Sequence, residues 1–152
     1  MSSLTFSALS PTLIEQARAA ALAAGAVAEA ADDGPFPVRC CLTDASADEG
    51  VLLVSLQPPC AGSPYTAAGP VYIHSHRCGG YRAHGAVPEM LRSRLLSLRG
   101  YDHGHMITAT EVVHGDQLEA AADRLLAIAG TAYLFVHFAG PGCYACRIDA
   151  AA

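Results

Sequence analysis

The fold is decided by the stretch Met106–Phe138, which reads MITATEVVHGDQLEAAADRLLAIAGTAYLFVHF. Its two ends, Met106–Val113 and Ala132–Phe138, are apolar and rich in β-branched or aromatic residues, which is typical of strands. Between them, apolar residues recur at helical spacing and predict a helix over 116–129 with one buried stripe. That stripe consists of Leu118, Ala122, Leu125 and Ile128.

Outward from this stretch, the chain carries further strand patterns and few helical ones. We expect additional strands at Val38–Leu42, Val51–Leu56, Val71–His76, Leu95–Leu98 and Tyr144–Ile148. A short helical turn is expected near Pro88–Leu91. A long helix is expected at the N-terminus, over about 10–31. Runs of strands with few helices between them favour an α+β fold, with a mostly antiparallel sheet of six to seven strands and two main helices. We expect a single domain over 1–152, with its strand-rich core at about 37–149.

Both main helices have sequence signals at their ends. Ser10-Pro11 pairs a capping serine with a proline at the first helical position, and Asp32–Pro35 is expected to end that helix. Asp116, with Glu119 three residues later, has the spacing of a capping box. Gly130 is expected to end the second helix.

Composition limits the classes of protein to which the chain can belong. Its 152 residues are 52% hydrophobic and 15% charged, which is typical of a globular protein with a buried core. The net charge is −5, and all nine basic residues are arginines. The absence of lysine excludes Schiff-base and P-loop lysine chemistry, and the acidity argues against nucleic-acid binding. Without an export signal or a membrane-spanning run, a cytoplasmic location with six reduced cysteines and no membrane partner is expected.

Histidine and cysteine gather in one segment that begins with Val71-Tyr72-Ile73-His74-Ser75-His76-Arg77-Cys78. On a strand, His74, His76 and Cys78 would share one face, because side chains alternate with period two. Such a face suits general acid–base or thiol chemistry, with His74 and Cys78 as catalytic groups. No cofactor is needed for that role. The alternative is a zinc or iron site on His74 and His76, with Cys78, His103, His105 or His137 completing it.

A second set of candidates lies farther along the chain. Arg99 with Tyr101 and Tyr65 can anchor a small anionic ligand, since an arginine fork grips a carboxylate or phosphate at two points. Tyr65 sits in a long loop, Gln57–Gly69, and long loops are often functional. Cys143, at the mouth of a glycine turn, is the more reactive member of Cys143-Tyr144-Ala145-Cys146, while Cys146 is expected to be buried. Cys40 and Cys41, on opposite faces of a predicted strand, are interpreted as core residues.

Several short motifs occur together in an ordered series. They are Arg39-Cys40-Cys41-Leu42, Ser63-Pro64-Tyr65, Gly69-Pro70-Val71 with His74 and Cys78, Leu98-Arg99-Gly100-Tyr101-Asp102, and Gly142-Cys143-Tyr144. In this order they resemble the bacterial family known as Domain of Unknown Function 1203, over roughly Val38 to Asp149. The resemblance implies a shared fold and a shared pocket but no reaction. It favours His74, Cys78, Arg99, Tyr101 and Cys143 over His76, His84, His105 and Cys146, and thereby weakens the metal alternative.

Three functions follow from these patterns. The leading hypothesis is a small cytosolic protein that binds or acts on a small anionic metabolite through His74, Cys78 or Cys143, and Arg99 with Tyr101. The second is a metal protein built on His74 and His76. The third is a non-catalytic binding or assembly module, for which a homodimer is the default partner.

Overall fold

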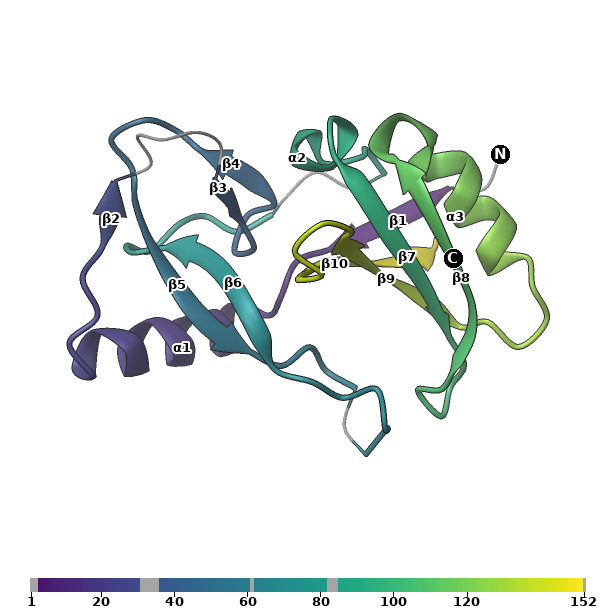
Figure 1. Cartoon of the computed structure of the whole chain (residues 1–152), viewed down its shortest axis with the longest axis horizontal. Helices are drawn as coiled ribbons and strands as arrows, with labels where there is room; N and C mark the ends of the chain where they lie inside the picture. Colours follow the sequence, from purple (N-terminus) through teal and green to yellow (C-terminus); the bar gives the residue numbers. More distant parts are fainter. Residues whose placement is uncertain (1–2, 31–35, 61, 82–84, 152) are drawn as a thin grey trace.

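A computed structural model describes residues 3–30, 36–60, 62–81 and 85–151. The described residues form two five-stranded sheets and a few helices, which confirms the α+β class (Figure 1). The first sheet is antiparallel throughout, in the order β1-β10-β9-β7-β8. Its strands are β1 (Leu4–Ser7), β10 (Tyr144–Ala150), β9 (Tyr133–Phe138), β7 (Leu95–Tyr101) and β8 (Ile107–His114).

The second sheet has the order β2-β5-β6-β3-β4. Its strands are β2 (Glu29–Ala30), β5 (Gly50–Leu56), β6 (Gly69–His74), β3 (Phe36–Val38) and β4 (Thr43–Ala45). All pairings in it are antiparallel except that of β3 with β6, which is parallel with Val38 opposite Tyr72. The strands are therefore divided between two sheets instead of forming the one sheet of six to seven strands that the sequence predicts.

The helices cover the outer sides of these sheets. They are α1 (Pro11–Ala23), α2 (Glu89–Arg92), a 3₁₀ turn η1 (Gly115–Gln117) and α3 (Leu118–Leu126). In Figure 1, α3 lies to the right of the first sheet, and the second sheet and α1 lie to the left of the first sheet. Among the described residues, every helix is too short or too polar to cross a bilayer.

Two hydrophobic clusters follow from this arrangement. In the first, Leu118, Ala122 and Leu125 of α3 pack against one face of the first sheet, as predicted. The predicted helix over 116–129 is too long, because α3 ends at Leu126, and Ile128 of the predicted stripe lies beyond it and is exposed. The second cluster joins the opposite face of that sheet to the second sheet and α1. It includes Tyr101, Tyr133, Phe135 and Tyr144 from the first sheet, Val51, Val54, Val71 and Ile73 from the second, and Ile14 from α1. The sheets thus bury their apolar residues against each other.

The predicted strand Val38–Leu42 is wrong beyond its first residue. β3 ends at Val38, and the chain reverses through a turn over 39–42 so that Thr43 of β4 pairs with Val38. Leu42 has a φ of 56°, a left-handed conformation that no strand contains. The run of cysteine and leucine has strand propensity, but here the tertiary fold overrides it.

The strand predicted over Val71–His76 ends at His74. His74 pairs with Val51, and Ser75 N–H donates to the carbonyl of Gly50, the first residue of β5. Because β5 offers no further partner, the chain leaves the sheet there. His76 and Cys78 therefore do not share a strand face with His74, contrary to the sequence prediction.

The helix ends are only partly as predicted. Ser10 caps α1 by accepting a hydrogen bond from Leu13 N–H at 3.2 Å, with Pro11 at the first helical position. α1 nevertheless ends well before residue 31, because Gly25 takes a left-handed φ of 88°. The predicted end at Asp32–Pro35 lies outside the described residues. Asp116 is not a side-chain cap, since it lies within η1 and α3 begins after Gln117.

Gly115 provides a test of this packing. A Cβ atom at this position would lie 1.8 Å from the carbonyl oxygen of Leu91, a backbone atom that cannot move aside cheaply. We expect Gly115→Ala to lower the free energy of unfolding by about 3 kcal/mol, measured by urea denaturation. Gly69→Ala is the control, because a Cβ there meets nothing within 4 Å. Equal stability of the two variants would contradict the packing.

Candidate functional site

The turn over 39–42 sends side chains in two directions. Arg39 reaches the first sheet, where its Nε donates to the carbonyl of Tyr144 at 2.7 Å and its Nη2 to the Sγ of Cys143 at 3.0 Å. Cys40 points the other way, and its Sγ lies 3.4 Å from Nδ1 of His74 at the end of β6. One turn therefore contributes to two separate groups of chemically active residues.

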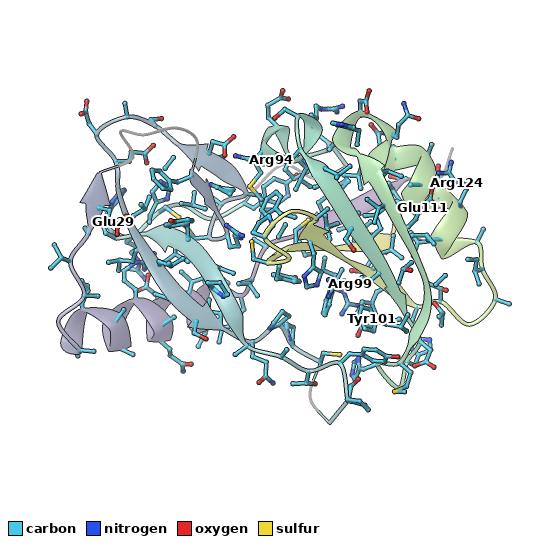
Figure 2. The ribbon with its side chains drawn as sticks, viewed as in Figure 1. Glu29, Arg94, Arg99, Tyr101, Glu111 and Arg124 are labelled. Atoms are coloured by element: carbon cyan, nitrogen blue, oxygen red, sulfur yellow. The ribbon has the colours of Figure 1, made fainter. Side chains whose placement is uncertain are left out.

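The first group lines a cavity of about 160 Å³ between the loop after β5 and the first sheet. Its wall includes Tyr65, Arg99, Tyr101, His137 and Cys143. Arg99 and Tyr101 lie two residues apart on β7, so they share a face, and Figure 2 shows both on the side toward the second sheet. Four residues that the sequence singled out from distant segments thus border one cavity.

Aromatic rings form the floor of this cavity. The rings of Tyr65 and Tyr101 are 6.2 Å apart and edge-on, while Tyr101 stacks on Tyr133 at 5.4 Å. Tyr101 is buried, and burial raises the pKa of its hydroxyl, an effect that the charge of Arg99 partly offsets. This phenol is therefore a neutral hydrogen-bonding group at physiological pH.

Arg39 lies behind the cavity and is only 1% exposed. Besides Tyr144 and Cys143, its guanidinium donates to the carbonyl of Pro37 and lies 4.9 Å from the ring centre of Phe138. Burial lowers the pKa of Arg39, and the neighbouring Cys143 opposes that shift. A buried guanidinium is thus held mainly by backbone carbonyls, a sulfur and an aromatic face.

The arginines differ in their partners. Six of the eight arginines in the described segments form ion pairs with carboxylates: Arg18, Arg77, Arg92, Arg94, Arg124 and Arg147. The two others, Arg39 and Arg99, have no carboxylate partner among the described residues, and both lie next to Cys143 or its cavity. Within the described part of the chain, the two guanidinium groups that lack a carboxylate partner therefore both lie close to Cys143.

His137 on β9 completes the cavity wall. Its Nδ1 lies 3.0 Å from the carbonyl oxygen of Gly142, which can only accept, so Nδ1 carries the hydrogen and Nε2 is the basic nitrogen. Burial lowers the pKa of His137 to about 4. Its ring is therefore neutral near pH 7.

The second group consists of Cys40, Cys41, His74 and Cys78. One donor atom from each lies within 4.8 Å of every other. His74 is 5% exposed, and its Nδ1 is 3.4 Å from the Sγ of Cys40 and 3.7 Å from that of Cys41. The hydrogen bond between the two adjacent thiols lowers the pKa of Cys41 to about 5 and raises that of Cys40.

The other nitrogen of His74 faces a carboxylate. Its Nε2 lies 2.6 Å from Oε2 of Glu49, within ion-pair distance although not aligned as a hydrogen bond. The amide of Ser46 donates to Glu49, which is the main reason that the pKa of this carboxyl is lowered. The ring of His76 is 5.0 Å from that of His74 but is solvent-exposed.

The predicted site residues thus fall into two places. Tyr65, Arg99, Tyr101 and Cys143 line the cavity, whereas His74 and Cys78 are absent from its wall and join Cys40 and Cys41. A second set of possible metal ligands, Glu49, His74 and His76, shares His74 with the cluster. The other histidines proposed as ligands, His103, His105 and His137, belong to neither set within the described segments. Cys146 is fully buried as expected, and burial raises its pKa to about 12.

Sequence reasoning gave no role to Arg39 or Glu49, placed Cys40 and Cys41 in the core, and considered His137 only as a metal ligand. The strand pattern of Val38–Leu42 assigned both cysteines to the core, and only the left-handed turn brings them to His74. A signal was present, because Arg39-Cys40-Cys41 belongs to the same ordered motifs as His74 and Cys143.

Fold and site together define a small α+β protein with two sheets, a cavity lined by Arg99 and Cys143, and a thiol–imidazole cluster. The chain belongs to the family of proteins of unknown function DUF1203, whose model matches residues 35–150. No curated protein and no solved structure matches the chain significantly. The family assignment confirms the resemblance seen in the motifs and carries no activity with it.

The pKa of His137 gives a direct test of the cavity wall. Its value of about 4 in the folded chain lies below the ordinary 6.5, so the unfolded chain binds more protons between these values. The stability contributed by neutral His137 is complete above pH 6.5 and is lost as the pH falls toward 4. We expect an NMR titration of its ring to show a midpoint near 4, and His137→Asn to reduce the loss of stability over this range. A midpoint near 6.5 would contradict the buried, neutral ring.

Proposed function

We propose that the cavity lined by Arg99, Tyr101 and Cys143 binds a small anionic metabolite. The observation that carries this proposal is the meeting of Arg39 and Arg99, the two described arginines without a carboxylate partner, at Cys143 and its cavity. A buried or half-buried guanidinium is costly unless it is paired. Arg39 is engaged by protein carbonyls and the sulfur of Cys143, whereas a carboxylate or phosphate on the ligand would supply a counter-ion for Arg99 on the cavity wall.

Each wall residue has a distinct task in this proposal. Arg99 grips the anionic group through its fork of N–H donors, and Tyr65 and Tyr101 contact the body of the ligand. A cavity of about 160 Å³ suits a metabolite of a few carbon atoms. The neutral hydroxyl of Tyr101 can donate a hydrogen bond to the ligand without repelling its negative charge.

Cys143 is the proposed nucleophile. Its sulfur lies on the cavity wall and accepts a hydrogen bond from the guanidinium of Arg39 at 3.0 Å, and cysteine sulfur is an intrinsically strong nucleophile. His137, on the same wall with Nε2 unprotonated, is the proposed general base. His74 and Cys78, the other catalytic candidates from the sequence, have no part in this cavity.

The state of the cysteines supports the proposed cytoplasmic location. All six are free thiols, three buried and three partly exposed. Free thiols that face a cavity stay reduced in a compartment poised by glutathione or thioredoxin.

The anion preference of Cys143 is measurable with two alkylating reagents. Thiolate attack on iodoacetate or iodoacetamide forms a carbon–sulfur bond and releases iodide, and the reagents differ in that only iodoacetate is charged. We expect the ratio of the two rates at Cys143, measured by peptide mass spectrometry, to favour iodoacetate. Arg99→Gln is expected to lower that ratio about tenfold, since local positive potential raises the encounter rate with anions.

Arg92→Gln is the matched control, because Arg92 lies outside the cavity and pairs with Glu89 and Glu119 at the surface. It removes the same charge from the chain and is expected to leave the ratio unchanged. Equal ratios in Arg99→Gln and the parent protein would refute anion recognition by this cavity. Protection of Cys143 by millimolar phosphate or acetate is the second readout.

A further inference from the structure

The thiol–imidazole cluster has a closed arrangement of four donor atoms. Cys40, Cys41 and Cys78 contribute sulfur, and His74 contributes Nδ1, all within 4.8 Å of one another. Tetrahedral zinc with Zn–S of about 2.3 Å and Zn–N of about 2.0–2.1 Å places neighbouring sulfur and nitrogen donors about 3.5 Å apart. Nδ1 of His74 lies 3.4 Å from the sulfur of Cys40 and 3.7 Å from that of Cys41, which are close to the distance expected for zinc.

The surroundings of these donors also match a metal centre. Histidine ligands of zinc commonly direct the second ring nitrogen to a carboxylate, which orients the ring. Here Nε2 of the 95% buried His74 is 2.6 Å from Glu49. The amide of His74 donates to the sulfur of Cys40 at 3.4 Å, and the hydroxyl of Thr43 lies 3.1 Å from the sulfur of Cys41. Such hydrogen bonds stabilise thiolate ligands.

The local charge is suited to a thiolate-rich site. Three thiolates and one divalent ion leave a net charge of −1. Arg18 donates to the carbonyl of His74 at 3.0 Å. Arg18 and Arg77 line a cavity of about 290 Å³ that also reaches Cys40 and Cys78. The cavity gives a metal ion access to the cluster. Its two guanidinium groups share one carboxylate, that of Glu15, which leaves a net positive charge beside the thiolates.

We infer that Cys40, Cys41, His74 and Cys78 bind one zinc ion as a structural site. This site differs from the anion cavity and from the ligand set that the sequence suggested, since it replaces His76 and His103 with the two cysteines of the turn. Soft sulfur donors with one imidazole favour zinc over harder ions, and four protein ligands leave no position for a substrate. The ion would fix the turn over 39–42 and hence the position of Arg39.

The test is the metal content of the full chain, produced without an affinity tag in zinc-supplemented medium. We expect about one zinc per chain by elemental mass spectrometry after dialysis, and less than about 0.1 in Cys41→Ser and Cys78→Ser. Cys143→Ser is the matched control, since that sulfur lies outside the cluster, and it is expected to keep its zinc. The Cys143→Ser variant also separates the two proposals, because it abolishes alkylation at position 143 and is expected to leave the zinc content unchanged.

Two further measurements do not depend on the folding of a cysteine variant. Parent protein stripped with a chelator under reducing conditions and refilled with Co²⁺ is expected to show sulfur-to-cobalt charge-transfer absorption. Glu49→Gln is expected to weaken zinc affinity about 10–100-fold, the usual effect of losing a carboxylate behind a histidine ligand. A parent chain that takes up less than about 0.1 zinc after reconstitution, or zinc fully retained in both Cys41→Ser and Cys78→Ser, would overturn the inference.

Discussion

The arrangement of the two sheets depends on one buried cation. Arg39 leaves the second sheet at the end of β3 and is satisfied almost entirely by the first, through the carbonyl of Tyr144, the sulfur of Cys143 and the ring of Phe138. A charge that is only 1% exposed is stable only if its donors are all engaged. The sheets therefore have to meet with β10 against the turn after β3, and the cavity beside Cys143 follows from that contact.

The same turn links the two proposed sites. Arg39 donates to Cys143 on the wall of the anion cavity, and the next two residues, Cys40 and Cys41, belong to the thiol–imidazole cluster around His74. Because Arg39, Cys40 and Cys41 are consecutive, a change in the backbone of this turn would act on both the cluster and the hydrogen bond from Arg39 to Cys143. The two proposed sites are therefore close neighbours through this turn.

The sequence predicted the elements better than their assembly. The stripe Leu118, Ala122 and Leu125 predicted α3, because helical period and burial agree there. The turn after Val38 could not be predicted, since its left-handed Leu42 depends on pairing between β3 and β4. Likewise, the parallel contact of β3 with β6 separates His74 from Cys143, and no local pattern encodes it. Cavity residues such as Arg99 and Tyr101 were recognisable because their chemistry is unusual for a strand.

The contact between Arg39 and Tyr144 spans 105 positions of the chain. During synthesis on the ribosome, β3 emerges long before β10, which supplies the carbonyl of Tyr144. The pairing of β1 with β10 likewise joins the first and last strands of the chain and can form only late. The first half of the nascent polypeptide therefore exposes a solvated guanidinium beside two adjacent thiols until translation is nearly complete. Under the proposed zinc binding, an ion held once His74 and Cys78 have emerged would cover those thiols and order the reverse turn before β10 is made.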